Sequence, residues 1–167
     1  MTTLLSFPTI GQTIPAKALV LSLGAQVGLP TGQVVGGTSF ILGGDLKLHY
    51  GLSDKLSLTF TTGGYHFFPI QNIPGATRES FGVGPLKAGA KYFVGPNVYV
   101  AGEVGAGVEV TESGFEGGHT KTLLSPGVGY ANERWDFGLR YEDYSGNNFH
   151  YGQVAVRAGY GLRLNKK

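Results

Sequence analysis

The sequence predicts an all-β fold, an eight-stranded antiparallel up-and-down transmembrane β-barrel. Hydrophobic residues alternate with polar or glycine residues in eight separate runs, and the connections between these runs alternate between short and long. The hydrophobic rows of these runs contain no Asp, Glu, Lys or Arg. Since successive side chains of a β-strand point to opposite faces, each run is expected to form one strand with one hydrophobic face.

The first four runs each gather their hydrophobic residues on one row. The run 19–29 has leucine, alanine and valine at its odd positions, with Val20, Ser22, Gly24, Gln26 and Gly28 opposite. The row of the run 40–50 is Phe40, Leu42, Leu46, Leu48 and Tyr50. The runs 56–61 and 86–94 present Leu56, Leu58 and Phe60, and then Leu86, Ala88, Ala90, Tyr92 and Val94. These rows predict the first four strands.

The last four runs repeat the pattern. The run 98–110 has Val98, Val100, Val104, Ala106, Val108 and Val110 on one row, and the run 124–130 has Leu124, Val128 and Tyr130. The run 135–142 has Trp135, Phe137, Leu139 and Tyr141, and the run 153–162 has Val154, Val156, Ala158, Tyr160 and Leu162. These rows predict the remaining four strands.

The connections between the runs differ in length in a regular way. The stretches 51–55, 95–97 and 131–134 are short, whereas those near 30–38, 69–80, 111–121 and 143–151 are longer and rich in Gly, Pro, Asn and Ser. Short turns at one rim and long loops at the other are typical of transmembrane barrels. An even number of strands brings both termini to the short-turn rim, which we expect to lie in the periplasm.

The same alternation would suit a soluble barrel of the lipocalin type, in which the hydrophobic row points inward. Glycines in the polar row favour the opposite arrangement, because they cover nothing on a soluble surface but make room inside a narrow barrel. Aromatic residues of the hydrophobic row also gather at one level, near the short turns or the C-terminus: Tyr50, Tyr92, Tyr130, Trp135 and Tyr160. They predict an interfacial aromatic girdle, and Phe40, Phe68 and Tyr151 are expected to begin a second one at the other rim.

The composition fits one domain and excludes several classes of function. The net charge of +2 is too small for a nucleic-acid-binding surface, and the absence of cysteine excludes disulfides and thiolate metal sites. The sequence contains no run of about 18 consecutive apolar residues, so it predicts no transmembrane helix.

The barrel is expected to span residues 18–164, after a lead-in at 1–17 and before a short tail at 165–167. The apolar segment Met1–Gln12 is either the remnant of a secretory signal peptide or an ordinary lead-in.

Three segments carry a resemblance to a known family. The segments Tyr50–Lys55, Ala88–Phe93 and Ser125–Tyr130 resemble the outer membrane protein beta-barrel family that is common in Bacteroidetes. In architecture the chain, over roughly residues 18–164, is similar to the small barrels of outer-membrane protein A and X. The resemblance implies a monomer without a cofactor in the outer membrane of a Gram-negative bacterium. Its partners would be membrane lipid, lipopolysaccharide and an envelope protein that contacts the extracellular loops.

Charged residues of the polar row are expected to meet inside the barrel. Five acids and five bases share this row: Asp45, Glu103, Glu109, Asp136 and Glu142, with Lys47, Lys87, Lys91, Arg140 and Arg157. They predict a packed lumen closed by ion pairs, and the alternatives are a proton relay, a gate or an acid–base pair. The short turn at 95–97 places Lys91 opposite Ala101 and diagonal to Glu103, which predicts an ion pair.

Two further predictions concern the lumen. Arg140 and Arg157 lie at a similar depth along their strands, so they are expected to lie side by side, with Asp45 and Glu103 as their counter-ions. An added cation at Gln26 in the polar row should be tolerated better than one at Leu46 or Val104 in the hydrophobic row.

Few residues suggest catalysis or metal binding. The four histidines are His49, His66, His119 and His150, and they form no close pair of the kind that binds a metal. An acyl-transfer site would need a hydroxyl, a histidine and an orienting acid, for which the candidates are His66, or His150 with Ser145 and Asp143. The glycine-rich segment Gly102–Gly107 is not a dinucleotide site, because a strand and not a helix follows it.

These observations favour a non-enzymatic role. The leading hypothesis is a membrane scaffold with a closed polar lumen, whose loops contact lipopolysaccharide or an envelope partner. The segments Pro69–Pro74 and Gly114–Gly118 are the candidate contact loops. A narrow channel or a conduit for hydrophobic ligands is the second hypothesis, and a lipid A-modifying enzyme is the third.

Overall fold

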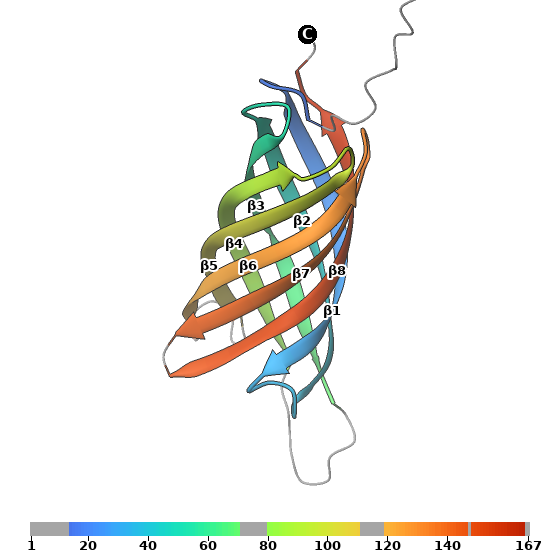
Figure 1. Cartoon of the computed structure of the whole chain (residues 1–167). Coiled ribbons are helices and arrows are strands. Elements are labelled where there is room, and N and C mark those ends of the chain that lie inside the picture. Colours follow the sequence, from blue (N-terminus) through green and yellow to red (C-terminus); the bar gives the residue numbers. More distant parts are fainter. Residues whose placement is uncertain (1–13, 71–79, 111–118, 147, 166–167) are drawn as a thin grey trace, which may run out of the picture.

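The computed structural model describes residues 14–70, 80–110, 119–146 and 148–165, and these residues form a closed antiparallel barrel (Figure 1). Its strands are β1 (Leu19–Gly32), β2 (Thr38–Gly51), β3 (Leu56–Pro69), β4 (Phe81–Phe93), β5 (Val98–Val110), β6 (Thr120–Ala131), β7 (Trp135–Gly146) and β8 (Phe149–Arg163). Each strand pairs with its neighbours in sequence, and β8 pairs with β1 to close the sheet. The predicted fold class is therefore confirmed.

The two ends of the barrel differ, and we name them by what they carry. The terminal end holds the start of β1, the end of β8 and the short turns 52–55, 94–97 and 132–134, and it lies at the top of Figure 1. The loop end holds the connections 33–37, 70–80, 111–119 and 147–148. Residues 1–13, 71–79 and 111–118, with the segment Met1–Gln12 and most of both candidate contact loops, lie outside the described residues.

Several strands run further toward the loop end than the sequence pattern indicates. Strand β3 continues to Pro69, and β7 and β8 leave only residues 147–148 between them, where a long loop at 143–151 was expected. The connection 33–37 is likewise a five-residue turn and not a long loop. The loop expected at 143–151 was wrong because polar residues such as Asp143 and His150 continue the ladder where the pattern loses its hydrophobic row. The stretch expected at 30–38 is shorter because residues 30–32 continue β1 opposite β8.

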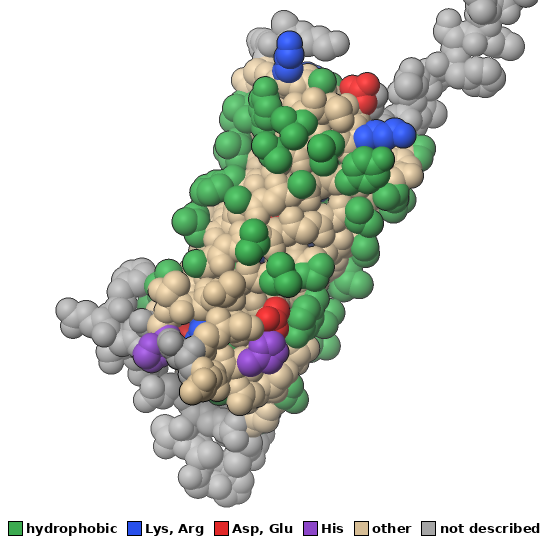
Figure 2. Space-filling view, turned by 60° about the vertical axis from the view of Figure 1, so that its left-hand side comes forward, with side chains coloured by type: hydrophobic (Ala, Val, Ile, Leu, Met, Phe, Trp, Pro, Cys, Tyr) green, Lys and Arg blue, Asp and Glu red, His purple; other side chains and the backbone are tan. Residues whose placement is uncertain are grey.

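The hydrophobic row faces outward along the whole barrel. Leu23 is 66% exposed and Val104 is 56% exposed, whereas Lys87 in the polar row is 1% exposed. Figure 2 shows hydrophobic side chains over the flank, with charged side chains toward both ends and histidines toward the loop end. This surface is the reverse of a soluble barrel and matches the apolar band of a transmembrane one. No helix among the described residues is long and apolar enough to cross a membrane.

The residues that precede β1 fold back over the terminal end. Lys17 adopts a left-handed conformation with φ 64°, and its N–H donates to the carbonyl of Gly51 at 2.8 Å. The side chain of Asn165 accepts from the N–H of Leu19 and donates to the carbonyl of Lys17. Ile14 is thereby held against the barrel mouth and is 6% exposed. Residues 14–18 thus cover this end of the lumen.

Candidate functional site

Seven charged side chains form one continuous chain of alternating sign across the lumen. We call it the central ion chain, and its order is Lys47, Glu103, Lys87, Glu142, Arg140, Asp45 and Arg157. Its members come from β2, β4, β5, β7 and β8, so the chain connects opposite walls of the barrel. All seven are buried. Each charge therefore depends on its neighbours in the chain, because little water reaches it.

Asp45 is the carboxylate that joins the two arginines near one end of the central ion chain. Arg157 donates to it from Nε at 2.9 Å and from Nη2 at 2.6 Å, and Arg140 donates from Nη2 at 2.9 Å. Gly24 and Gly159 flank the Arg157 guanidinium so closely that a Cβ at either position would overlap it. Glycine in the polar row thus makes room for a long lumen side chain. The two arginines lie together and share Asp45, in agreement with that part of the sequence reasoning.

The two glutamates of the central ion chain are satisfied by neutral donors as well as lysines. Glu103 lies 3.2 Å from Lys47 and accepts a hydrogen bond from the Thr61 hydroxyl at 2.7 Å. Glu142 pairs with Lys87 and accepts from the Tyr144 hydroxyl at 3.1 Å and from Gln153 Nε2 at 2.6 Å. Several partners around each carboxylate offset the free energy lost when a charge leaves water.

Lys91 belongs to a separate pair, nearer the terminal end. It pairs with Asp136, which also accepts from the Tyr99 hydroxyl at 2.6 Å, and its Nζ lies 3.9 Å from the centre of the Tyr99 ring. The expected register of Lys91 opposite Ala101 is present, but the predicted pair of Lys91 with Glu103 is wrong. Glu103 serves Lys47 and Lys87 instead, and it is not a counter-ion of the arginines. In so narrow a barrel, side chains on facing strands are as close as diagonal neighbours.

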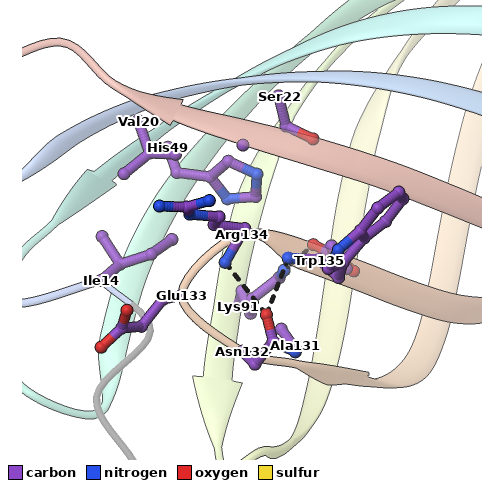
Figure 3. Close-up of a pocket in the computed structure, with 12 residues that line it drawn as sticks. Ile14, Val20, Ser22, His49, Lys91, Ala131, Asn132, Glu133, Arg134 and Trp135 are labelled. Atoms are coloured by element: carbon purple, nitrogen blue, oxygen red, sulfur yellow. Dashed lines mark hydrogen bonds and ion pairs between the residues drawn. The ribbon is translucent and has the colours of Figure 1, made fainter.

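A small cavity lies between the Lys91 pair and the lead-in (Figure 3). It holds about 20 Å³, and Ile14, His49 and Lys91 are among its lining residues. His49 is 2% exposed and its Nδ1 lacks a hydrogen-bond partner among the described residues. A cavity of this size has room for one water molecule. Asn132 closes the adjacent turn, since its Oδ1 accepts from the N–H groups of Arg134 at 3.0 Å and Trp135 at 2.8 Å.

Between the central ion chain and the loop end, the lumen is filled by hydrophobic side chains. We call this group the aromatic plug; it contains Val34, Ile41, Tyr65, Phe67, Val83, Leu123, Tyr144 and Tyr151. The rings of Tyr144 and Tyr151 stack with their centres 5.1 Å apart. The prediction that Tyr151 belongs to an outer girdle was wrong, because Tyr151 is fully buried. It shares the parity of Gln153 and Arg157 in β8, which is the signal that would have placed it in the lumen.

Glu109 differs from the other acids of the polar row. It is half-buried in β5 and accepts a hydrogen bond from the Tyr151 hydroxyl at 2.7 Å. That contact places it beside the aromatic plug rather than in the central ion chain. The lumen thus changes along its length from charged to aromatic.

The five aromatic residues expected in a girdle lie on the outer face near the terminal end. Tyr50, Tyr92, Tyr130 and Trp135 are each 42–47% exposed, and Tyr160 is half-buried against Trp135 with ring centres 5.2 Å apart. At the loop end, the rings of Phe40 and Phe68 stack at 4.6 Å on the outer side. This arrangement suits side chains that meet the two membrane interfaces.

One group of potentially reactive side chains lies on the outer face of the loop end. His150 lies in β8 and not in a loop as expected, directly opposite Ser145 of β7. Ser145 Oγ lies 2.7 Å from Asp143 Oδ2 and 3.0 Å from His150 Nδ1, and His150 Nε2 lies 3.1 Å from Asp143 Oδ1. We call these three residues the rim triangle. The other candidate, His66, lies on β3 with its ring edge-on to Phe68.

The described residues offer no evident metal centre. Within them, no three side chains of His, Asp or Glu gather as metal ligands would. His119 and His66 lie on separate strands or connections from the rim triangle. The chemistry available in the described part of the chain is therefore that of the lumen charges and the rim triangle.

Comparison with known proteins identifies the architecture. No protein-family model matches the sequence, and no curated protein matches it. The family expected from the sequence motifs therefore stays a prediction. The crystal structure of Ail, the attachment invasion locus protein of Yersinia pestis, superposes with a TM-score of 0.60 at 14% identity, covering 88% of this chain and 99% of that chain.

Two other solved structures are similar to a comparable degree. Neisserial surface protein A superposes with a TM-score of 0.58 at 15% identity, covering 87% of this chain and 97% of that chain. The N-terminal β-barrel domain of OprF from Pseudomonas aeruginosa gives 0.51 at 14% identity, covering 88% of this chain and 98% of that chain. With the outward hydrophobic face, these likenesses show that the chain has the fold of a small eight-stranded outer-membrane β-barrel.

Proposed function

We propose that this chain is an integral outer-membrane scaffold with a closed lumen, whose loop end faces the outside and contacts lipopolysaccharide or an envelope partner. The barrel interior carries no catalytic role in this proposal. The terminal end, with both termini, lies in the periplasm. The observation that carries the proposal is the filled lumen, in which the central ion chain and the aromatic plug occupy successive levels.

The packing of the lumen argues against an open pore. Two cavities lie beside the lumen charges, and they hold about 20 and 30 Å³, which is room for one or two water molecules each. Moving the central ion chain aside would leave buried charges without partners, at a cost of several kcal/mol for each ion. A steady ionic current would require the lumen to open, and each opening would cost the free energy of separating these ion pairs.

Two structural relatives bear names that suit a surface role. Ail is named as an attachment invasion locus protein, and the Neisserial protein is named as a surface protein. These names concern those proteins, and they support a surface-binding role here only by analogy of fold.

Conductance measurements test the closed lumen. Refolded protein in planar bilayers is expected to give negligible steady current, because the aromatic plug blocks the path of hydrated ions. A variant that combines Tyr65→Ala with Tyr151→Ala removes two rings of the plug and tests how much of the barrier the plug provides while the central ion chain stays in place. Large, stable unitary currents from the wild-type barrel would contradict the proposal and support the channel hypothesis.

Epitope tags test the orientation in the membrane. A tag inserted after Val35, in the turn at the loop end, should bind antibody on intact cells. A tag inserted after Ser53, in a turn at the terminal end, should be labelled only after the outer membrane is permeabilised. The reverse pattern would place the termini outside the cell and overturn the orientation.

A further inference from the structure

We propose that the rim triangle of Ser145, His150 and Asp143 is a serine-type acyl-hydrolase site that acts on carboxylic esters of outer-leaflet lipids. This activity goes beyond the scaffold role, since it lies on the outer face of the barrel and uses none of the lumen charges. The three side chains come from two paired strands, with Asp143 and Ser145 two residues apart in β7 and His150 opposite Ser145 in β8. All three therefore project from the same face.

The contacts in the rim triangle match the roles of a nucleophile, a base and an orienting acid. His150 Nδ1 lies 3.0 Å from Ser145 Oγ, and its Nε2 lies 3.1 Å from Asp143 Oδ1. The histidine is thus held through one ring nitrogen while the other faces the hydroxyl. Such a site is recognised by geometry and not by the order of residues in the chain.

The rim triangle can hold its proton in two places. With a neutral imidazole, Ser145 donates to His150 Nδ1 and the Nε2–H donates to Asp143. With a protonated imidazole, the Nδ1–H donates to Ser145 Oγ, which lies 2.7 Å from Asp143 Oδ2 and donates to it. In the second arrangement every contact of the triangle carries a hydrogen, whereas in the first the single Ser145 proton faces His150 and leaves the contact with Asp143 Oδ2 without one. A general base needs this ability to accept a proton without losing its position.

Neighbouring elements hold the rim triangle in place. The backbone N–H of His150 donates to Gln33 Oε1 at 2.6 Å, from the turn between β1 and β2. Lys121 Nζ on β6 donates to the carbonyl of Gly146 at 2.6 Å, next to Ser145. Support from outside the triangle is what a preorganised site requires. The side chain of His150 is 55% exposed and that of Asp143 is 22% exposed, so a lipid can reach them.

The depth of the rim triangle points to lipid esters as substrates. Ser145 follows Trp135 of the aromatic girdle by ten residues in β7. At the rise and tilt of a barrel strand this is about 25 Å along the barrel axis, the height of the apolar band. Tyr141, two residues before Asp143 on the same face of β7, is 37% exposed on the outer surface. An acyl chain lying against β7 would bring its ester group to the level of Ser145.

The reaction is an ordinary ester hydrolysis. Ser145 Oγ attacks the carbonyl carbon while its proton passes to His150 Nδ1. The bond from the carbonyl carbon to the alcohol oxygen breaks, and the proton moves from Nδ1 to that oxygen. Water then attacks the acyl-serine, gives its proton to Nδ1, and releases the carboxylic acid as Ser145 Oγ regains the proton. Thr122 lies directly opposite Ser145 in β6, and we assign its hydroxyl as the donor to the developing oxyanion.

Covalent labelling tests the site directly. Refolded wild-type protein in vesicles is expected to react with a fluorophosphonate probe, and peptide mass spectrometry should locate the label on Ser145. Ser145→Ala should remove the label, and His150→Gln should slow labelling by at least about 100-fold. Ser39→Ala is the matched control, since Ser39 is an exposed rim serine on β2 that contacts backbone carbonyls. His66→Gln controls for an outer-face histidine.

Turnover identifies the lipid source. Fatty-acid release is measured from phospholipid vesicles and from vesicles that contain lipopolysaccharide, each with wild-type protein and with Ser145→Ala. Release above the Ser145→Ala background in either vesicle supports the proposal and names the substrate. No label on Ser145, or a label without release from either lipid, overturns it. Equal gel shifts on heating of all variants verify that each barrel is folded.

Discussion

Replacing Asp45 with alanine is expected to destabilise the folded barrel by about 3–5 kcal/mol. Asp45 is 2% exposed and accepts charged hydrogen bonds from both Arg140 and Arg157. Without the carboxylate, two guanidinium groups remain together in the lumen and repel each other. The loss is expected as a lower midpoint in urea unfolding of the refolded protein in lipid vesicles, followed by tryptophan fluorescence from Trp135.

Two further variants separate this effect from a general loss of charge. Asp54→Ala removes an acid from an exposed turn at the terminal end and should change stability by less than about 0.5 kcal/mol. Asp45→Ala combined with Arg157→Ala should be more stable than the sum of the single changes implies, because it removes one uncompensated cation. Strict additivity would mean that the Asp45–Arg157 pair contributes nothing specific to stability.

A cation on the outer face should be the other costly change. Val104 lies near the middle of β5 and is 56% exposed, so Val104→Arg places a charge near the centre of the apolar band. We expect a loss of about 2–4 kcal/mol in the same unfolding assay. Leu52→Arg, at an exposed turn of the terminal end, is the matched control and should cost less than about 1 kcal/mol. Equal losses in the two variants would contradict the outward orientation of the hydrophobic row.

The structure changes what is expected of the polar row. From parity alone, Gln26→Arg should be better tolerated than a cation on the outer face. Gln26 is 4% exposed, however, and its Oε1 accepts from Arg140. An arginine at this position would add a third cation beside Arg140 and Arg157, so we now expect Gln26→Arg to be destabilising as well.

The alternation of odd and even positions along each strand, which we call parity, is the feature that made the fold predictable from sequence. A strand in a closed sheet alternates between lipid and lumen at every residue, so Leu23 and Arg157 are assigned to opposite faces without knowledge of any partner. The same rule holds near the rims, where hydrophobic and polar residues alternate less clearly. Tyr151 carries a hydrophobic side chain on the lumen side, and it was misplaced because an aromatic ring near a rim suggested a girdle rather than a plug.

The partners of the lumen charges were harder to predict. The register of β4 and β5 follows from the turn between them, but Lys91 reaches across the lumen to Asp136 on β7. Whether two side chains can meet across the lumen depends on the diameter of the barrel and on the stagger of its strands, and the sequence of a single hairpin specifies neither. The contacts within the rim triangle could not be predicted for a related reason. Its three residues were named as candidates, but only the continuation of β7 and β8 to Gly146 and Phe149 brings them into contact.

The order of the central ion chain has a consequence for how the barrel assembles in the membrane. Asp45 is on β2, whereas both of its arginines arrive with β7 and β8. An intermediate without these last two strands has an uncompensated carboxylate, which must stay hydrated. Water around Asp45 therefore leaves the lumen in the same step in which β8 pairs with β1 and closes the sheet. Insertion is expected to end in one cooperative transition, in which sheet closure and expulsion of water cannot be separated.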